Sequence, residues 1–242
     1  MFIKKFVSLF LIITILSLSF TFDVSAKKPY FVLDGYDYSL DVPSSEAKPL
    51  SYFNDAVILG DSRTVDLVIY SDLSKSKAMP YCDIGLNVTS VFNKEFVSYD
   101  GVKVDAFTAM AHNKKKFSKV YLMFGINELG YNSTESFIKQ YIKVVNRVRS
   151  INKDAVIYVH SILPVSKQKS LSSNIYTNRK IKKVNRYLLK MCQEYKLFYI
   201  DAYDEFSNNE GYLPYGAATD GIHFGSTYSQ RWLVFVATHT VK

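Results

Sequence analysis

The chain has 242 residues, of which 48% are hydrophobic and 21% charged, with only two cysteines. These values fit one globular domain with a full core, and they exclude a largely disordered chain, a disulfide-dense scaffold and a protein with many membrane spans. The net charge is +8, and the basic residues are scattered except for the triplet at 114–116. We therefore expect a solvated basic surface that favours an anionic neighbour such as a cell-wall polymer, and no nucleic-acid binding.

The first 26 residues have the pattern of a secretory signal. Lys4 and Lys5 precede an apolar run at 6–22, and small residues follow at Val24, Ser25 and Ala26. As a helix the run would reach only about 25 Å, short of the roughly 30 Å core of a bilayer. We predict cleavage after Ala26 and a secreted or cell-surface protein. An uncleaved N-terminal anchor is the alternative, and it would be the chain's only membrane contact.

Apolar runs typical of buried parallel strands recur from residue 55 onward. Residues 27–54, in contrast, contain three prolines and mixed polarity, which favours a linker or an N-terminal wrap over the domain. The domain itself is predicted to span 55–242. Its five strand runs are at 56–59, 81–84, 120–124, 155–159 and 197–200.

Helical patterns separate these runs. Asn132 is a candidate N-cap with Glu135 three positions on, and apolar residues follow at helical spacing to Val148. A second stripe extends from Ile181 to Tyr195, and shorter helices fit 64–73 and 226–238. The alternation predicts an α/β fold, a three-layer αβα sandwich around a five-stranded parallel sheet.

The two cysteines fall within these predicted elements. Cys82 lies in a strand run and Cys192 on an apolar helix stripe, so both are predicted to be buried thiols. A disulfide between them after export stays open. The four histidines form no close cluster with the cysteines, and we expect neither a metal site nor a cofactor.

Polar residues stand where predicted strands end, which is where ligands bind in such sheets. Gly60-Asp61-Ser62 follows the first run, Gly85 the second and Asn127-Glu128 the third, while Asp220 precedes His223 by three residues near the C-terminus. A serine, a base, a carboxylate and amide donors are the set of groups needed for acyl transfer.

These blocks resemble the SGNH hydrolases, also called GDSL esterases and lipases, over residues 56–239. The resemblance implies the flavodoxin-like SGNH hydrolase fold, with Ser62 as nucleophile and Asp220 and His223 completing the triad. It also implies an oxyanion hole made by Ser62, Gly85 and Asn127.

Asp61, Arg63 and Glu128 are possible supporting residues. Leucine is usual in the family where Arg63 stands, and aspartate where Glu128 stands. A cation in the first turn of a helix is unfavourable, so we predict that a salt bridge to Glu128 compensates Arg63.

The combined prediction is an exported serine esterase that hydrolyses short acyl esters, with O-acetyl on carbohydrate favoured. Its expected partners are a small ester or acetylated glycan substrate and an anionic cell-wall polymer. The alternatives are a lysophospholipase, thioesterase or acyltransferase of the same family, or a non-catalytic protein that binds surface glycans.

Overall fold

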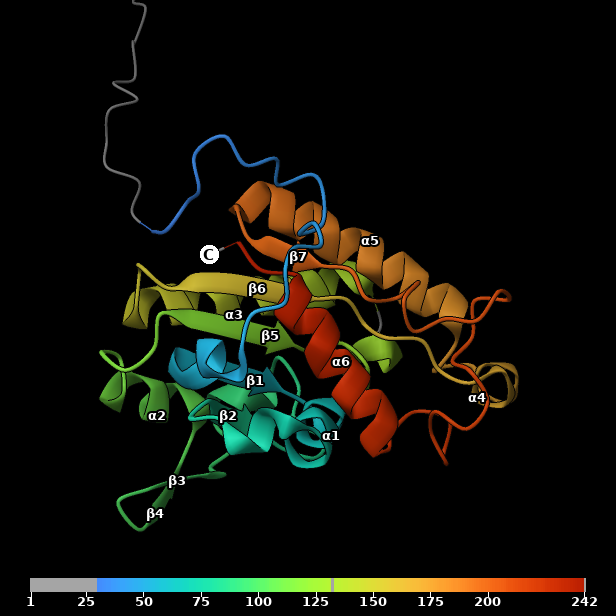
Figure 1. Cartoon of the computed structure of the whole chain (residues 1–242), viewed down its shortest axis with the longest axis horizontal. Helices are drawn as coiled ribbons and strands as arrows, with labels where there is room; N and C mark the ends of the chain where they lie inside the picture. The colour runs from blue at the N-terminus through green and yellow to red at the C-terminus, as the bar shows by residue number, and fades with distance from the viewer. Residues whose placement is uncertain (1–29, 132, 242) are drawn as a thin grey trace, which may run out of the picture.

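A five-stranded parallel sheet forms the centre of the molecule (Figure 1). The structure is a computed structural model that describes residues 30–131 and 133–241. The strand order is β2-β1-β5-β6-β7, and every neighbouring pair is parallel. The strands are Ala56–Gly60 (β1), Met79–Cys82 (β2), Lys119–Met123 (β5), Val156–His160 (β6) and Phe198–Ile200 (β7).

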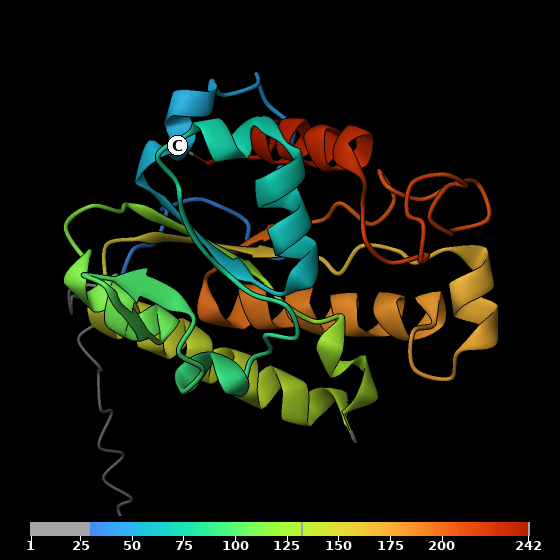
Figure 2. The same cartoon turned by 90° about the horizontal axis from the view of Figure 1, so that it is seen from below.

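Helices cover both faces of the sheet, which confirms the predicted three-layer α/β sandwich. Figure 2 shows α1 and α6 above the sheet and α3 and α5 side by side below it. A small antiparallel hairpin, β3 (Val97–Tyr99) with β4 (Val102–Val104), projects from the β2 side. The helices are Ser62–Tyr70 (α1), Ala106–His112 (α2), Thr134–Ile151 (α3), Lys167–Ser172 (α4), Asn178–Tyr195 (α5) and Ser226–Thr238 (α6).

Several element boundaries differ from the expected ones for local chemical reasons. Strand β2 ends at Cys82, two residues earlier than predicted, because the chain turns through Asp83 to Gly85, whose φ of 72° is favourable only for glycine. The N-cap of α3 is Ser133, whose hydroxyl accepts the Ser136 N–H. The predicted cap, Asn132, lies outside the described residues. The hairpin, α2 and α4 were not predicted, because their segments are too short to show a clear period.

Residues 30–54 wrap over the domain. The Val42 N–H donates to the Tyr199 carbonyl (2.7 Å), and the Ser45 N–H donates to the Thr238 carbonyl (2.7 Å), which joins this segment to β7 and α6. Tyr38 is buried and packs on Phe198. The segment is therefore part of the folded unit. The predicted signal at 1–26 lies outside the described residues.

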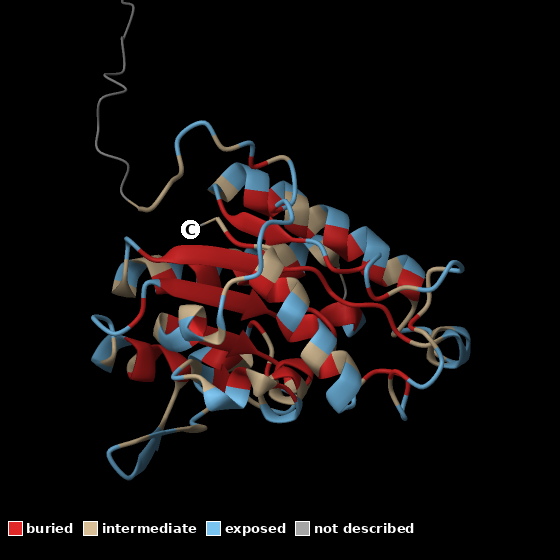
Figure 3. Cartoon of the chain, in the orientation of Figure 1, coloured by how far each residue is buried: buried red, intermediate tan, exposed pale blue. Residues whose placement is uncertain are grey.

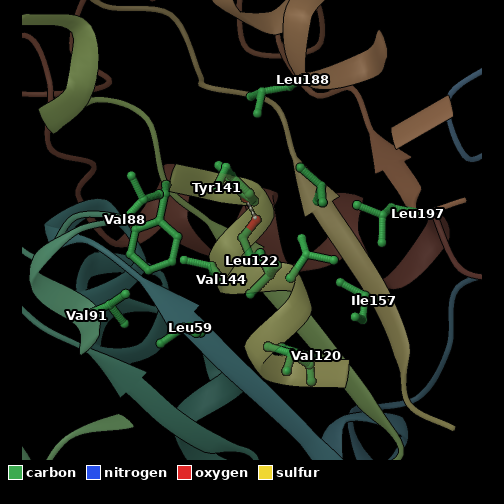
Figure 4. Close-up of a cluster of buried hydrophobic side chains, with 14 of the residues drawn as sticks. Leu59, Val88, Val91, Val120, Leu122, Tyr141, Val144, Ile157, Leu188 and Leu197 are labelled. Carbon is green, nitrogen blue, oxygen red and sulfur yellow. Dashed lines mark hydrogen bonds between the residues drawn. The ribbon is translucent and has the colours of Figure 1, made fainter. Parts of the chain in front are cut away.

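Apolar side chains fill both spaces between the sheet and its helices. Figure 3 shows that the central strands of the sheet are buried, whereas the β3–β4 hairpin, the outer helix faces and the loops are exposed. The layer under α2, α3 and α5 is drawn in Figure 4, where Leu59, Leu122 and Tyr141 meet in one cluster. Over residues 30–131 and 133–241, no helix combines the length and apolar character required to cross a bilayer. Because apolar side chains pack against both faces of the sheet, the sheet is a rigid base for the loops that follow its strands.

Candidate active site

Ser62 is the first residue of α1, and only Asp61 separates it from the end of β1. Asp61 caps the helix, since its carboxylate accepts the Arg63 N–H at 3.0 Å. Gly60 is required for this turn, because a Cβ there would overlap the Thr64 hydroxyl and the Met123 carbonyl oxygen. The serine hydroxyl thus lies at a helix N-terminus, where backbone N–H groups are oriented to stabilise negative charge.

Ser62, His223 and Asp220 form one hydrogen-bonded chain, as predicted. Ser62 Oγ is 2.8 Å from His223 Nε2, and His223 Nδ1 is 2.6 Å from Asp220 Oδ2. The other carboxylate oxygen of Asp220 accepts the backbone N–H groups of Ile222 (2.9 Å) and His223 (2.8 Å). Gly221 makes the intervening turn possible with a φ of 80°. With Asp220 on Nδ1, the imidazole presents Nε2 to the serine, the tautomer in which it can accept a proton.

Asp220 is held in its charged form. Burial alone would raise the pKa of this carboxyl, but hydrogen bonds from the His223 backbone and ring and from the Ile222 backbone lower it to about 2. About 48% of the Asp220 side chain and 41% of the His223 side chain remain exposed. The histidine and the carboxylate are therefore open to solvent.

Gly85 and Asn127 follow the two strands that flank β1. Gly60 of β1 pairs with Cys82 of β2 and with Met123 of β5, so the segments after these three strands leave the sheet at the same edge. The Asn127 side-chain amide donates to the Leu86 carbonyl at 2.8 Å, which connects the loop after β5 to the loop that contains Gly85. A side-chain amide carries two N–H groups, so one remains as a donor of the kind that an oxyanion hole requires.

The predicted salt bridge between Arg63 and Glu128 is wrong. Arg63 is 5% exposed, and its guanidinium donates to three backbone carbonyls: Ile222 (3.0 Å), Leu163 (2.8 Å) and Pro164 (2.6 Å). Arg63 packs over Phe224, in the layer that contains α6, whereas Glu128 accepts the Val88 N–H on the other side of the sheet. Their surroundings differ because α1 and the loop after β5 lie on opposite faces.

Burial controls the charge of the two acidic supporting residues. It raises the pKa of Asp61 to about 7. The hydrogen bond from the Arg63 N–H and the charges of Arg63 and His223 lower this pKa, but burial has the larger effect. Burial likewise raises the pKa of Glu128 to about 8, although the Val88 N–H lowers it. Glu128 Oε2 is buried without a hydrogen-bond partner. Glu128 is therefore largely protonated at neutral pH.

Asp66 is a nearby acidic residue that sequence reasoning missed. It lies one turn after Ser62 on α1 and is half-buried. Burial raises its pKa, whereas the His223 charge and the Phe224 N–H lower it, so this carboxyl faces the segment that carries the histidine. The spacing of four residues from Ser62 was the available signal, because side chains four apart share a helix face.

His160, which ends β6, has a structural role. Trp232 Nε1 donates to His160 Nε2 at 2.8 Å, and His160 Nδ1 is 2.7 Å from the Ser161 carbonyl. Burial lowers the pKa of His160 to about 4, so it is a neutral core residue. Both cysteines are free thiols; Cys192 in α5 is buried as predicted, whereas Cys82 in β2 is only partly buried because it ends the edge strand of the sheet.

Comparisons with known proteins agree with this architecture. The model of the GDSL-like lipase/acylhydrolase family matches residues 88–230, more than half of the chain. The match includes Asn127, Asp220 and His223 and begins after Ser62 and Gly85. A search of curated proteins found no match.

Solved structures share the fold at low sequence identity. A GDSL-like lipase from Bacteroides thetaiotaomicron superposes with a TM-score of 0.57 at 13% identity, over 79% of this chain and 88% of that one. A carbohydrate esterase of family 3 from Talaromyces cellulolyticus superposes with a TM-score of 0.51 at 16% identity, over 75% of this chain and 92% of that one. The acetyl xylan esterase AlAXEase superposes with a TM-score of 0.56 at 13% identity, over 77% of this chain and 99% of that one. Together with the family match, the fold places the chain in the GDSL-like lipase/acylhydrolase family of serine ester hydrolases.

Proposed function

We propose that the protein is an exported esterase that uses Ser62 to remove short acyl groups, chiefly O-acetyl, from carbohydrate. The observation that carries the proposal is the hydrogen-bonded chain from Ser62 through His223 to Asp220. A serine hydroxyl becomes a useful nucleophile only when a base accepts its proton, and here the base is within hydrogen-bond distance.

The reaction proceeds through an acyl-enzyme. Ser62 Oγ attacks the ester carbonyl carbon while His223 Nε2 takes the hydroxyl proton, and Asp220 stabilises the resulting imidazolium. The oxyanion receives hydrogen bonds from the backbone N–H groups of Ser62 and Gly85 and from the Asn127 amide. The C–O bond to the alcohol then breaks, and His223 returns the proton to the leaving oxygen. Water repeats the two steps and releases the acid and free Ser62.

Three features support a carbohydrate ester outside the cell. The N-terminal segment has the pattern of an export signal. His223 and Asp220 are partly exposed, so an acyl group on a polymer can reach them. Two proteins with the same fold are named as a carbohydrate esterase and an acetyl xylan esterase.

The nucleophile is tested with Ser62→Ala, and Ser226→Ala serves as the matched control because Ser226 is likewise the first residue of a helix. We expect Ser62→Ala to lower kcat for p-nitrophenyl acetate by several orders of magnitude, and Ser226→Ala to keep the wild-type value. Circular dichroism of both variants checks that they fold, and we expect wild-type spectra. Wild-type turnover by Ser62→Ala would end the proposal.

The acyl and alcohol specificity is tested with p-nitrophenyl esters of rising chain length and with acetylated glycans. We expect the highest kcat/KM with acetyl and release of acetate from a glycan. A maximum at eight carbons or more, without acetate from any glycan, would favour a lipid esterase. Acetate transferred to an added sugar acceptor in preference to water would identify a transferase.

A further inference from the structure

The positive charge of the protein is concentrated on two neighbouring helices. Helices α3 and α5 contain ten Lys and Arg residues and two Glu residues, a net charge of +8. The whole chain also has a net charge of +8, so the remaining residues sum to zero. Because α3 and α5 pack side by side on one face of the sheet (Figure 2), that face is strongly cationic.

The opposite face has no comparable excess of charge. Helix α6 contains one charged residue, Arg231, which is paired with Glu205 at 2.6 Å. Near α1, Lys75 is paired with Asp72 at 2.6 Å. An anionic polymer close to the protein is therefore attracted to the α3 and α5 face.

A pocket opens on this cationic face between the beginnings of the two helices. Its volume is about 430 Å³, and its walls include Ser133 and Thr134 at the start of α3 and Lys180 and Lys183 in the first turns of α5. This volume is within the range of pockets that bind small ligands, about 300–1,000 Å³. The positive end of the α3 dipole and two ammonium groups there favour an anionic group.

The pocket adjoins the candidate active site. Its wall includes Glu128, the residue after Asn127, and Tyr131. The Tyr131 hydroxyl is 3.1 Å from the Thr89 hydroxyl and donates to Asn87 Oδ1 at 3.4 Å, so the wall contacts the segment that follows Gly85. The pocket is therefore connected through its wall to the loop that contains Gly85 and to the residue that follows Asn127.

Two acidic residues, Glu128 and Glu135, also line the pocket, and only Glu135 is charged at neutral pH. Burial raises the pKa of Glu128 to about 8, so this carboxyl is largely neutral at pH 7. Glu135 is charged, but its carboxylate accepts the Tyr187 hydroxyl at 3.1 Å. The ammonium groups of Lys180 and Lys183 therefore face one charged carboxylate, and the net charge around the pocket is positive.

We propose that the pocket between α3 and α5, with the cationic face around it, binds an O-acetylated anionic glycan and presents its ester to Ser62. This inference rests on the proposed esterase function and names its substrate class. The pocket accommodates a sugar that bears a carboxylate or phosphate, and the exposed lysines and arginines bind neighbouring anionic units of the same chain. A duplex nucleic acid or an anionic membrane would contact the face without supplying an ester to the serine, so an acetylated glycan is the occupant that fits both features.

The test compares the variant Lys180→Gln/Lys183→Gln with a matched control, Lys75→Gln/Lys77→Gln, which removes the same charge from the opposite face. For each protein, kcat/KM is measured on partly acetylated polygalacturonate, on acetylated xylan and on p-nitrophenyl acetate. The measured quantity is the ratio of kcat/KM for the anionic polymer to that for p-nitrophenyl acetate. We expect the pocket variant to lower this ratio about five-fold, the effect of two solvent-exposed ion pairs, and the control to keep it.

Ionic strength provides an independent measurement on the wild-type protein. Raising salt from about 0.1 M to about 1 M shortens the Debye length from about 10 Å to about 3 Å. We expect the preference for acetylated polygalacturonate over acetylated xylan to disappear, with no comparable change for p-nitrophenyl acetate.

The outcomes separate this inference from the proposed function. If wild-type protein does not hydrolyse p-nitrophenyl acetate, the esterase proposal fails. If it does, and the pocket variant and its control give the same ratio, the esterase stands and the anionic-glycan site is refuted. Competition by single-stranded DNA, or binding to phosphatidylglycerol vesicles, that exceeds the effect of unacetylated polygalacturonate would also overturn the choice of a glycan.

Discussion

Replacing Arg63 by leucine, the residue usual in the family at this position, is expected to destabilise this protein. The guanidinium donates three hydrogen bonds, to the carbonyls of Ile222, Leu163 and Pro164, and it is 5% exposed. Leaving three buried carbonyls without their donor costs about 1–3 kcal/mol each, and part of this is offset because a guanidinium no longer has to be desolvated, for a total of about 3–5 kcal/mol. Burial of the leucine side chain returns about 1–2 kcal/mol. The net loss in the free energy of unfolding is therefore about 1–4 kcal/mol.

This loss is measurable as a change in both stability and activity. For a domain of this size each kcal/mol lowers the Tm by about 2–4 °C, so Arg63→Leu should lower it by about 2–16 °C. Because Ile222 precedes His223, loss of its anchor also displaces the base, and a shift of about 1 Å can cost about 100-fold in rate. We expect kcat/KM for p-nitrophenyl acetate to fall between about 10- and 100-fold. Arg63→Lys should have an intermediate effect, because an ammonium group cannot reach all three carbonyls.

The matched control is Arg179→Leu, because Arg179 is exposed in the first turn of α5. This substitution should keep the Tm within about 1 °C of the wild-type value, since surface substitutions usually change stability by less than about 0.5 kcal/mol. If Arg63→Leu matched the control in both Tm and kcat/KM, the three hydrogen bonds would have no role in holding the His223 segment.

Three further predictions concern the oxyanion hole, the response to pH and the N-terminus. Asn127→Ala should lower kcat about 100- to 1,000-fold with little change in KM, because it removes one oxyanion donor; unchanged kcat would exclude that role. The raised pKa of Glu128, about 8, means that the folded state binds the proton more tightly, so its contribution to stability is complete below about pH 4.5 and lost as the pH rises through 8. The Tm of the wild-type protein should therefore fall from pH 5.5 to pH 8.5, and the Tm of Glu128→Gln should fall less over the same range. If the Tm of both proteins changed equally with pH, the raised pKa of Glu128 would be contradicted. The mature secreted protein should begin at Lys27 by N-terminal sequencing, and a chain that begins at Met1 in the membrane fraction would indicate an uncleaved anchor.

Much of the fold could be predicted from local sequence patterns. The strand runs at 56–59 and 120–124 are continuous and apolar because these strands are buried on both faces of a parallel sheet, and both lie where they were expected. The spacing of Asp220 and His223 also defines their contact, because a three-residue turn with a glycine brings the two side chains together. In contrast, the β3–β4 hairpin and α4 are too short to have a detectable period.

What the sequence by itself determined is therefore the layered α/β fold and the set of residues at the strand ends. The tertiary structure decided which of these residues contact one another. Arg63 and Glu128 both stand next to site residues in the chain, yet they face opposite sides of the sheet and find different partners. Likewise the concentration of charge on one face arises only when α3 and α5 pack side by side, although they lie more than 20 residues apart in the sequence. The reason is physical: local patterns specify the direction and period of each element, whereas packing of the whole chain decides which faces meet.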